Sequence, residues 1–371
     1  MKEYDVLVIG GGIAGSIAAK TTAEGGLSTL LLEKEKTPRN KVCSGVQLKY
    51  LEKIIGSSIP REKLCKNQLD KVVITTPNNR RLSGRVSLLN FWRSVFDHWL
   101  NSMAIGKGVE FLDDNSVTDI RESDGGYVIK SNRQEFFANY VIGADGLSPN
   151  SISRRTISSE AFSDKITGSA MNYYFQGDSG IERNSLYVFY RKIFSNLMFS
   201  WVYYKDETLV VGTSSKENLV GYAESFYDYI KNEFELEGSI IRKEGYVTHC
   251  LEGICLGKDN ILLAGDAAGL LDLYRGVGMD IAAISGNLAG KSIIDSYEMG
   301  YPLLRHYEQI SSGLIKQIKR NNLRQEQRYS SDVSLEESLS LYNIIKGRII
   351  MSYAQIRNNF SSLEDYILLP P

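Results

Sequence analysis

A glycine-rich segment near the start of the chain has the spacing that phosphate-bearing ligands require. It reads GGGIAG over residues 10–15 and is followed by Glu33 at the end of the next apolar run. Gly10 permits a tight turn, Gly12 lets a pyrophosphate approach the backbone, and Gly15 lets a helix and a strand pack closely. Glu33 is placed to accept hydrogen bonds from ribose hydroxyls, which disfavours a ribose carrying a 2′-phosphate. The segment predicts dinucleotide binding but does not by itself separate NAD from FAD.

A second motif, ILLAGDAAG over residues 261–269, again follows an apolar strand pattern. Here the sequence resembles the FAD-dependent oxidoreductases of the para-hydroxybenzoate hydroxylase type. The resemblance implies FAD as the cofactor, with Asp266 binding its ribityl chain. A helix pattern from about Gly278 to Asp295 would direct backbone N–H groups at the flavin pyrimidine edge and favour negative charge there. A loop aspartate that caps a helix is the alternative interpretation of Asp266.

Two shorter segments match the same superfamily. RSVFDHWL at residues 93–100 is similar to its R-x-x-F-D-x-x-L helix, and GADG at residues 143–146 is similar to a turn of its dinucleotide pocket. The resemblance implies that Arg93 contacts the cofactor and that Asp145 completes its pocket. A surface-helix arginine and a plain turn stay open as alternatives. The full set of predicted cofactor contacts is Gly10, Gly12, Ile13, Ala14, Gly15, Glu33, Lys41, Arg93, Asp145, Gly265, Asp266, Gly276, Gly278 and Met279.

Within this superfamily the sequence resembles the geranylgeranyl reductases, enzymes that saturate double bonds of isoprenoid chains. KVCSGV at residues 41–46 looks like their K-x-C-G-G-G segment, and FSWVYYK at residues 199–205 is similar to their Y-x-W-x-F-P-K strand, which lines the prenyl cavity. The resemblance implies hydride transfer from reduced flavin to a geranylgeranyl-type lipid or a similar apolar substrate. The candidate catalytic residue is Cys43, and the candidate substrate-binding residues are Phe199, Trp201 and Tyr203. A structural role for the cysteine and ordinary strand packing for the aromatic residues are the alternatives.

The chain also departs from the reductase pattern. Ser44 stands where the family has Gly, Tyr204 stands where it has Pro, and residues 272–278 lack the family's usual Pro. These positions lie near the expected flavin face, so they leave the substrate open. The main alternative is an FAD-dependent monooxygenase that hydroxylates its substrate, since fold does not fix chemistry. A halogenase is disfavoured because the W-x-W-x-I-P motif is incomplete, and a non-catalytic flavin-binding protein is the third class.

The elements that must position these residues are of two kinds. Residues 5–9, 13–24 and 28–32 follow a strand–helix–strand pattern, whereas residues 167–246 contain the aromatic and β-branched runs of antiparallel strands. We therefore predict an α/β (α+β) fold in which a Rossmann-type FAD-binding domain is interleaved with an antiparallel-sheet substrate domain. The predicted boundaries are 1–70, 90–160 and 250–300 for the FAD-binding domain, 71–89 and 161–249 for the substrate domain, and 301–371 for a helical C-terminal region.

The composition is that of a globular protein without a charged polymer as its partner. The 371 residues are 43% apolar, and 43 Lys and Arg residues balance 44 Asp and Glu residues, which gives no support for nucleic-acid binding. Four cysteines, Cys43, Cys65, Cys250 and Cys255, lack the paired spacing of a zinc site, so no metal is predicted. A cytoplasmic location is expected because the N-terminus lacks a signal-peptide pattern.

A basic run near the C-terminus is a candidate for contact with lipid headgroups. Lys316, Lys319, Arg320, Arg324 and Arg328 recur at three- and four-residue spacing along one side of a helix. A solvated helix face is the alternative, because no strong apolar stripe accompanies the run. No apolar run approaches the ~18 residues of a membrane span, so any membrane contact is predicted to be peripheral. No second Rossmann unit is evident, so the expected electron donor is NAD(P)H bound transiently or a ferredoxin-like protein.

Overall fold

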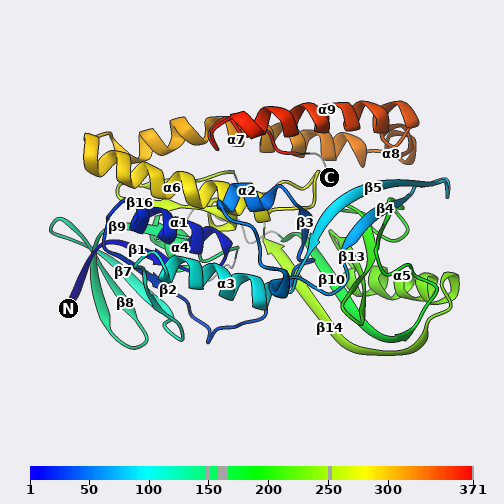
Figure 1. Cartoon of the computed structure of the whole chain (residues 1–371), viewed down its shortest axis with the longest axis horizontal. Coiled ribbons are helices and arrows are strands. Elements are labelled where there is room, and N and C mark those ends of the chain that lie inside the picture. The colour runs from blue at the N-terminus through cyan, green and yellow to red at the C-terminus, as the bar shows by residue number, and fades with distance from the viewer. Residues whose placement is uncertain (148–150, 158–165, 250–252, 370–371) are drawn as a thin grey trace.

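The computed structural model describes residues 1–147, 151–157, 166–249 and 253–369. The chain forms two sheets that lie beside each other along the long axis of the molecule, with a layer of long helices above both (Figure 1). The glycine-rich motifs belong to the first sheet and the aromatic strands to the second. A site that uses both sets of residues must therefore lie where the two sheets meet.

The first sheet contains the strand–helix–strand unit predicted from the glycine-rich segment. β1 (Lys2–Ile9) pairs in parallel with β2 (Thr29–Leu32) and β9 (Glu135–Gly143), and α1 (Ile13–Glu24) connects β1 to β2. The strand order is β15–β16–β9–β1–β2–β6, and β9 also carries a β7–β8 hairpin. The remaining strands are β6 (Glu110–Leu112), β7 (Val117–Ser123), β8 (Gly126–Ser131), β15 (Gly257–Lys258) and β16 (Ile261–Leu263). Because β1, β9 and β16 run parallel in register, the loops that follow them meet at one edge.

Small residues let α1 and α6 (Met279–Met299) lie close together over this sheet. A side chain added at Gly286 would overlap the carbonyl oxygen of Ala14, and one added at Gly290 would lie 3.0 Å from that of Ala18. A third helix, α3 (Arg93–Ile105), packs against α1. The close contact fixes the starts of α1 and α6 relative to each other, and both starts face the edge where the loops meet.

The second sheet is antiparallel apart from the pair of β4 with β11. Its order is β14–β10–β13–β12–β11–β4–β5–β3. Its strands are β3 (Val46–Leu48), β4 (Leu69–Thr75), β5 (Arg81–Asn90), β10 (Ile166–Asp178), β11 (Ser185–Phe189), β12 (Ser200–Lys205), β13 (Thr208–Ser215) and β14 (Glu237–His249). One face packs on α5 (Leu219–Glu233) through Phe189, Phe226 and Ile230. The opposite face is left to line a cavity.

The chain crosses between the sheets several times, as the interleaved pattern predicted. β3 falls in the range 1–70 that we assigned to the FAD-binding domain, yet it pairs with β5 at the edge of the second sheet. It directly follows the segment 41–46, which therefore lies at the junction of the sheets. The exact domain boundaries stay an interpretation.

Three helices after Pro302 form the upper layer in Figure 1: α7 (Leu303–Arg328), α8 (Asp332–Ser338) and α9 (Leu341–Phe360). The buried hydroxyl of Tyr307 on α7 donates to the carbonyl oxygens of Leu263 and Ser285, at 3.0 and 3.3 Å. This hydroxyl ties the layer to β16 and α6. In the part of the chain that is described, no helix is long and apolar enough to cross a membrane. The shorter helical elements are α2 (Leu51–Ile55), α4 (Ile152–Ile157), η1 (Arg61–Lys63) and η2 (Gly265–Ala268).

Candidate cofactor and substrate site

A large cavity of about 1500 Å³ lies at the junction of the two sheets. Pockets for one small molecule usually have roughly 300–1,000 Å³, so this cavity has room for two ligands. Its lining begins at Gly10 and Gly12, passes Cys43, follows the face of the second sheet at Trp201, and reaches α7, α8 and α9. It joins a compartment beside the glycine turn to a second, more apolar compartment.

The glycine turn has the backbone geometry that its spacing predicts. Gly10 has a φ of +103°, and a side chain there would meet the carbonyl oxygen of Ala144 at 2.5 Å. A side chain at Gly15 would overlap the Gly10 carbonyl oxygen. At Gly12, just before the first turn of α1, the nearest atom to an added side chain is Nη2 of Arg39 at 3.5 Å. The turn therefore exposes the N-terminus of α1 next to a cation, an arrangement that suits a diphosphate.

Four charged side chains of alternating sign lie beside this turn, two buried carboxylates and two partly buried arginines. Glu33 accepts a hydrogen bond from the Gly11 N–H at 2.9 Å and pairs with Arg39 at 3.0 Å. Arg39 also contacts Asp97 at 3.4 Å, and Asp97 pairs with Arg93 at 2.7 and 2.9 Å. Burial disfavours the charged form of Arg93, but the attraction of the Asp97 carboxylate exceeds this effect, so the pKa of Arg93 is raised. The protein thus already engages Glu33 and Arg93, and their contacts with a cofactor stay predictions.

Asp266 and Asp145 reach the cavity from the ends of β16 and β9. Asp266 lies in η2, directly after Gly265, whose φ is +59°. Asp145 accepts hydrogen bonds from the Ser151 hydroxyl at 2.8 Å and the Ser153 N–H at 3.2 Å, and burial raises its pKa. The Asp145 carboxylate therefore orders the start of α4. Its predicted place at the pocket agrees with the cavity lining, while direct contact with FAD stays a prediction.

Lys41 is a further cation in this compartment. Burial lowers the pKa of Lys41, and the Asp266 carboxylate partly offsets that effect. The Nζ atom lies 4.7 Å from the centroid of the Tyr246 ring, in a cation–π contact. Both residues line the cavity, as does Gly146. Lys41 is therefore placed to balance negative charge on a bound ligand.

The start of α6 forms another wall of the cavity. Gly276, with a φ of +63°, and Gly278, the residue before the helix, line the cavity together with Met279. Among the residues that the structure describes, no side chain caps this helix start. The preceding loop is held by the buried guanidinium of Arg275, which pairs with Asp280. An uncapped helix start at a cavity wall stabilises negative charge, as expected for the edge of a reduced flavin.

Cys43 lies between the two compartments. Its Sγ is 4.0 Å from Sδ of Met279, and the Arg93 guanidinium is also beside it. The next residue is held by the second sheet, because the buried hydroxyl of Tyr203 donates to the Ser44 carbonyl oxygen at 2.9 Å. Tyr203 therefore lines the cavity and also supports the segment that carries Cys43. Of the other cysteines, Cys250 lies outside the described residues.

Aromatic and aliphatic side chains line the second compartment. Phe199 and Trp201 meet edge to face with ring centroids 6.0 Å apart, and the Trp201 indole donates to Oδ1 of Asn172 at 2.9 Å. A side chain at Gly276 would lie 2.9 Å from the Phe199 ring, so that glycine leaves room for it. Other apolar residues of this compartment are Val72, Ile74, Leu186, Val188, Ile344 and Met351. Such a wall is suited to an apolar chain.

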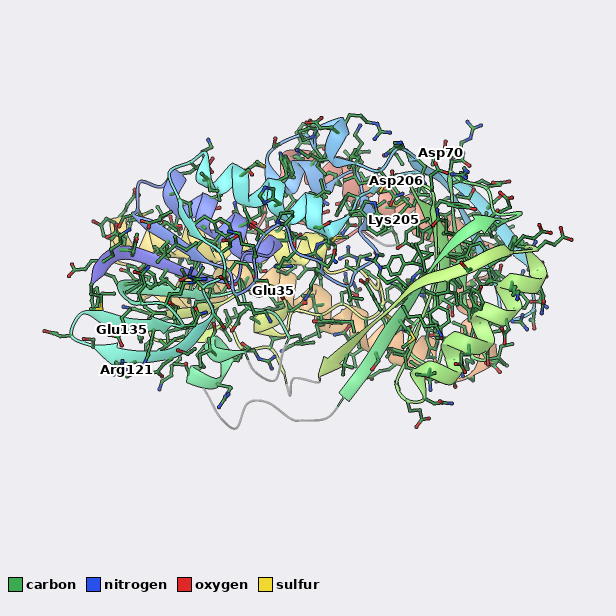
Figure 2. All side chains as sticks on the ribbon, turned by 90° about the horizontal axis from the view of Figure 1, so that it is seen from below. Glu35, Asp70, Arg121, Glu135, Lys205 and Asp206 are labelled. Atoms are coloured by element: carbon green, nitrogen blue, oxygen red, sulfur yellow. The ribbon has the colours of Figure 1, made fainter. Side chains whose placement is uncertain are left out.

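Lys205, at the end of β12, is a buried cation for which the sequence suggested no role. Its Nζ donates to the Phe91 carbonyl oxygen and lies 4.8 Å from the centroid of the Trp92 ring. Figure 2 shows Lys205 beside Asp206 near the junction of the two halves. Burial lowers the pKa of Lys205 to about 8.

Arg39 is a cavity residue that sequence reasoning missed. The available signal was a pair of cations, Arg39 and Lys41, in the loop that follows Glu33. That loop also contains Lys34, Glu35 and Lys36, and nothing in their order indicates which charge turns inward. The ion pairs with Glu33 and Asp97 decide it, and they depend on the placement of α3.

Known proteins resemble this chain over most of its length. The family described as pyridine nucleotide-disulphide oxidoreductase matches residues 4–151. Digeranylgeranylglycerophospholipid reductase 3 of Methanosphaera stadtmanae is 27% identical over 368 residues, covering 92% of this chain and 91% of that protein. An uncharacterized protein of Methanosarcina barkeri is 28% identical over 317 residues, covering 81% and 77%.

Solved structures confirm the predicted fold class. A geranylgeranyl bacteriochlorophyll reductase-like protein from Thermoplasma acidophilum superimposes with a TM-score of 0.80 at 23% identity, covering 99% of this chain and 100% of that one. A mutant of the halogenase PltM in complex with FAD gives a TM-score of 0.70 at 16% identity, covering 88% of this chain and 76% of that one. The fold is thus shared by reductase-like proteins and halogenases.

The glycine turn with its adjacent cations and the uncapped start of α6 fit the two charged regions of FAD, its diphosphate and its reduced ring. With this fold and these relatives, the protein is an FAD-dependent oxidoreductase. Within that class the chain is similar to geranylgeranyl reductase-like proteins and to digeranylgeranylglycerophospholipid reductases, in agreement with the resemblance of residues 41–46 and 199–205.

Proposed function

We propose that the protein reduces carbon–carbon double bonds in the isoprenoid chain of a lipid, of the geranylgeranyl type. The observation that carries the proposal is the continuous cavity of about 1500 Å³, which joins the cofactor compartment to an apolar one. The choice of an isoprenoid rests on the reductases among the relatives, several of which are named for digeranylgeranylglycerophospholipid. The two compartments meet at Cys43, where a double bond would have to lie.

Residues on several elements would hold FAD. The turn at Gly12 would receive the diphosphate, with Arg39 supplying the nearest positive charge. Asp266 would accept hydrogen bonds from the ribityl chain, and Lys41 would balance the charge of the reduced ring. Backbone N–H groups at the start of α6 would also stabilise the negative charge of the reduced ring.

The reaction adds one hydride and one proton across the double bond. When bound and reduced, FAD supplies the hydride. Phe199 and Trp201 would hold the chain and exclude water, which protects the reduced cofactor from side reactions. Cys43 is the proton donor that we propose, since its thiol lies between the compartments and beside Arg93. The two electrons come as a hydride from NAD(P)H or one at a time from a ferredoxin-type protein, and the protein meets its lipid through peripheral contact with a membrane.

Mass spectrometry of a geranylgeranyl lipid tests this function. The lipid is incubated with chemically reduced protein without air, and again with air and reductant present. We expect pairs of hydrogens to be added in the anaerobic arm. An oxygen atom added only in air would assign the protein to the hydroxylases instead, and an unchanged lipid with FAD still bound would count against a lipid substrate.

A pair of cysteine variants tests the proton donor. Cys43→Ala should retain FAD but lose most of its alkene reduction, since a proton donor typically contributes on the order of 100-fold or more to rate. Cys255→Ala is the matched control and should reduce the lipid normally, because Cys255 does not line the cavity. Normal alkene reduction by a Cys43→Ala and Trp201→Ala double variant would defeat both role assignments.

A further inference from the structure

The outer face of α9 carries a continuous apolar stripe that no described residue covers. Its six main residues have exposed fractions between 50% and 90% and are Leu341, Ile345, Ile349, Tyr353, Ile356 and Phe360. At 3.6 residues per turn, these positions fall within an arc of about 120° on the helix surface. Tyr342, 73% exposed, lies within the same arc. Soluble monomers seldom expose an apolar patch of this kind unless it binds something.

The opposite face of α9 is the one that holds the helix in place. Ala354 and Asn358 are buried, and the Asn358 side chain exchanges hydrogen bonds with the backbone of Ile367 at 2.8 Å in both directions. Ile344 and Met351, also on this face, line the large cavity. The apolar stripe is therefore not the side through which α9 packs on the rest of the protein, because the opposite side of α9 already makes those contacts.

The charges of α9 identify what the stripe fits. The segment 341–360 contains Lys346, Arg348 and Arg357 and no acidic residue. By helical position, Lys346 and Arg357 flank one edge of the stripe and Arg348 flanks the other. None of the three forms an ion pair with a described residue. An apolar stripe edged by unpaired cations, with tyrosines along it, is complementary to the surface of an anionic lipid bilayer.

A second copy of this chain fits less well. Joining two such stripes would bring six unpaired cations close together without a counter-charge, which disfavours the contact. The basic run predicted on α7 is also not a simple lipid-facing row. Arg328 is turned inward, where it donates to the Tyr274 hydroxyl at 2.6 Å, while Arg320 and Arg324 remain exposed and line the cavity.

We propose that α9 lies flat in the interface of an anionic bilayer, with its stripe inserted among the acyl chains and with Lys346 and Arg357 at the headgroups. The same helix forms part of the cavity wall, so a lipid chain would pass from the bilayer to the cavity beside α9 without crossing water. The reason why the protein would bind a bilayer rests on the proposed function. The docking itself rests on the stripe and its charges.

Vesicle flotation with the full-length, FAD-loaded protein tests this inference. The vesicles contain phosphatidylcholine alone, or phosphatidylcholine and phosphatidylglycerol in equal parts. We expect the wild type to float with the anionic vesicles and much less with the neutral ones. Ile345→Glu with Ile349→Glu should weaken binding on the order of tenfold or more, because both substitutions place a charge in the stripe. Lys346→Gln with Arg357→Gln should reduce anionic binding to near the neutral level.

The matched control places the same charges on exposed apolar residues elsewhere. Val220→Glu with Ile241→Glu, at positions 53% and 55% exposed on α5 and β14, should float like the wild type. Retained flavin absorbance and circular dichroism establish that each variant is folded. The inference is overturned if the wild type floats no better with anionic vesicles than with neutral ones. It is also overturned if the Ile345→Glu and Ile349→Glu variant still floats with anionic vesicles like the wild type.

Two further measurements separate this inference from other outcomes. If sedimentation shows a wild-type dimer that the α9 variant converts to a monomer with vesicle binding unchanged, the stripe is a subunit interface and the inference fails. Turnover on a lipid dissolved in detergent tests the proposed function alone, because Ile345 and Ile349 do not line the cavity. Failure of turnover with intact vesicle binding would leave the docking surface standing.

Discussion

Several single residues at the cavity fit their surroundings only because of their size or because a partner offsets their charge. Gly15 has no space for a side chain against the Gly10 carbonyl oxygen. Arg39 lies between Glu33 and Asp97, and removing it would leave the buried Glu33 carboxylate without its ion pair, while Asp97 would keep its pair with Arg93. Changes at this scale should therefore affect cofactor binding before they affect the fold as a whole.

Gly15→Ala should abolish stable FAD binding. The added methyl group would push α1 away from the turn, so the helix N-terminus would no longer meet the diphosphate. Flavin absorbance of the purified protein measures the effect. Gly106→Ala is the control, because Gly106 has a φ of −62° and its nearest neighbours would lie at 3.4 and 3.5 Å. FAD retained at equal occupancy in both variants would contradict this view of the turn.

Lys205 should make the stability of the protein depend on pH. Burial lowers its pKa to about 8 from an ordinary value of 10.5. Between these values the unfolded chain binds more protons than the folded one, so the free energy of unfolding rises with pH. From pH 7 to pH 9.5 the gain is about 2 kcal/mol, at ~1.4 kcal/mol per pKa unit.

Urea unfolding at both pH values measures this gain, and Lys205→Met should remove it. The range stops below pH 10 because buried tyrosines such as Tyr203, whose pKa is raised by burial, oppose the effect at higher pH. An unchanged pH dependence in the variant would mean that another group is responsible.

At the scale of elements, β12 links the apolar wall to the cofactor compartment. Its successive residues alternate in direction, so Trp201 and Tyr203 face the cavity while Val202 and Tyr204 face the core under α5. Tyr203 uses its hydroxyl to hold the Ser44 carbonyl, whereas the Tyr204 hydroxyl bonds to the Ser179 hydroxyl at 2.8 Å. The two neighbouring tyrosines therefore have different roles: Tyr203 supports the segment that carries Cys43, and Tyr204 packs in the core under α5.

Tyr203→Phe should lower turnover on the order of tenfold while FAD stays bound, because a small displacement of the Cys43 segment misplaces the reacting groups. Tyr204→Phe removes a hydroxyl from the same strand and should leave turnover near the wild-type value. Steady-state kinetics with equal flavin occupancy compare the two. Equal losses in both variants would point to a general weakening of the sheet.

At the scale of the whole molecule, a buried charge cluster joins the C-terminal tail to the cofactor compartment. Arg275 pairs with Asp280 at the start of α6 and donates to the Leu369 carbonyl oxygen at 2.7 Å. Asp272, whose pKa is raised by burial, accepts a hydrogen bond from Asn321 of α7 at 2.7 Å. The tail and α7 therefore fix the loop that contains Gly276 and Gly278.

Arg275→Met should lower the free energy of unfolding by about 3–5 kcal/mol, because it leaves buried carboxylates unpaired. It should also weaken FAD binding through the adjacent loop. Arg81→Met removes an exposed arginine paired with Glu233 and should cost less than about 1 kcal/mol. Chemical unfolding with and without FAD compares them. A small loss for Arg275→Met would show that the cluster contributes little.

The sequence by itself determined the local features of this protein. The glycine turn, the parallel strand–helix–strand unit and the two types of sheet follow from short spacings, because backbone geometry and strand alternation are set by neighbouring residues. The resemblance in four separate motifs predicted an FAD-dependent fold, and that of residues 41–46 and 199–205 predicted similarity to geranylgeranyl reductases; the comparisons confirm both.

Only the tertiary structure decided which groups meet. The contacts of Arg39 with Asp97, of Tyr203 with Ser44 and of Arg275 with Leu369 join residues far apart in the chain, so no local pattern reports them. The helix at 341–360 has apolar residues on two sides, and its sequence cannot tell which side is buried. Packing of the inner side against the tail leaves the other exposed, since one helix face can fill only one core.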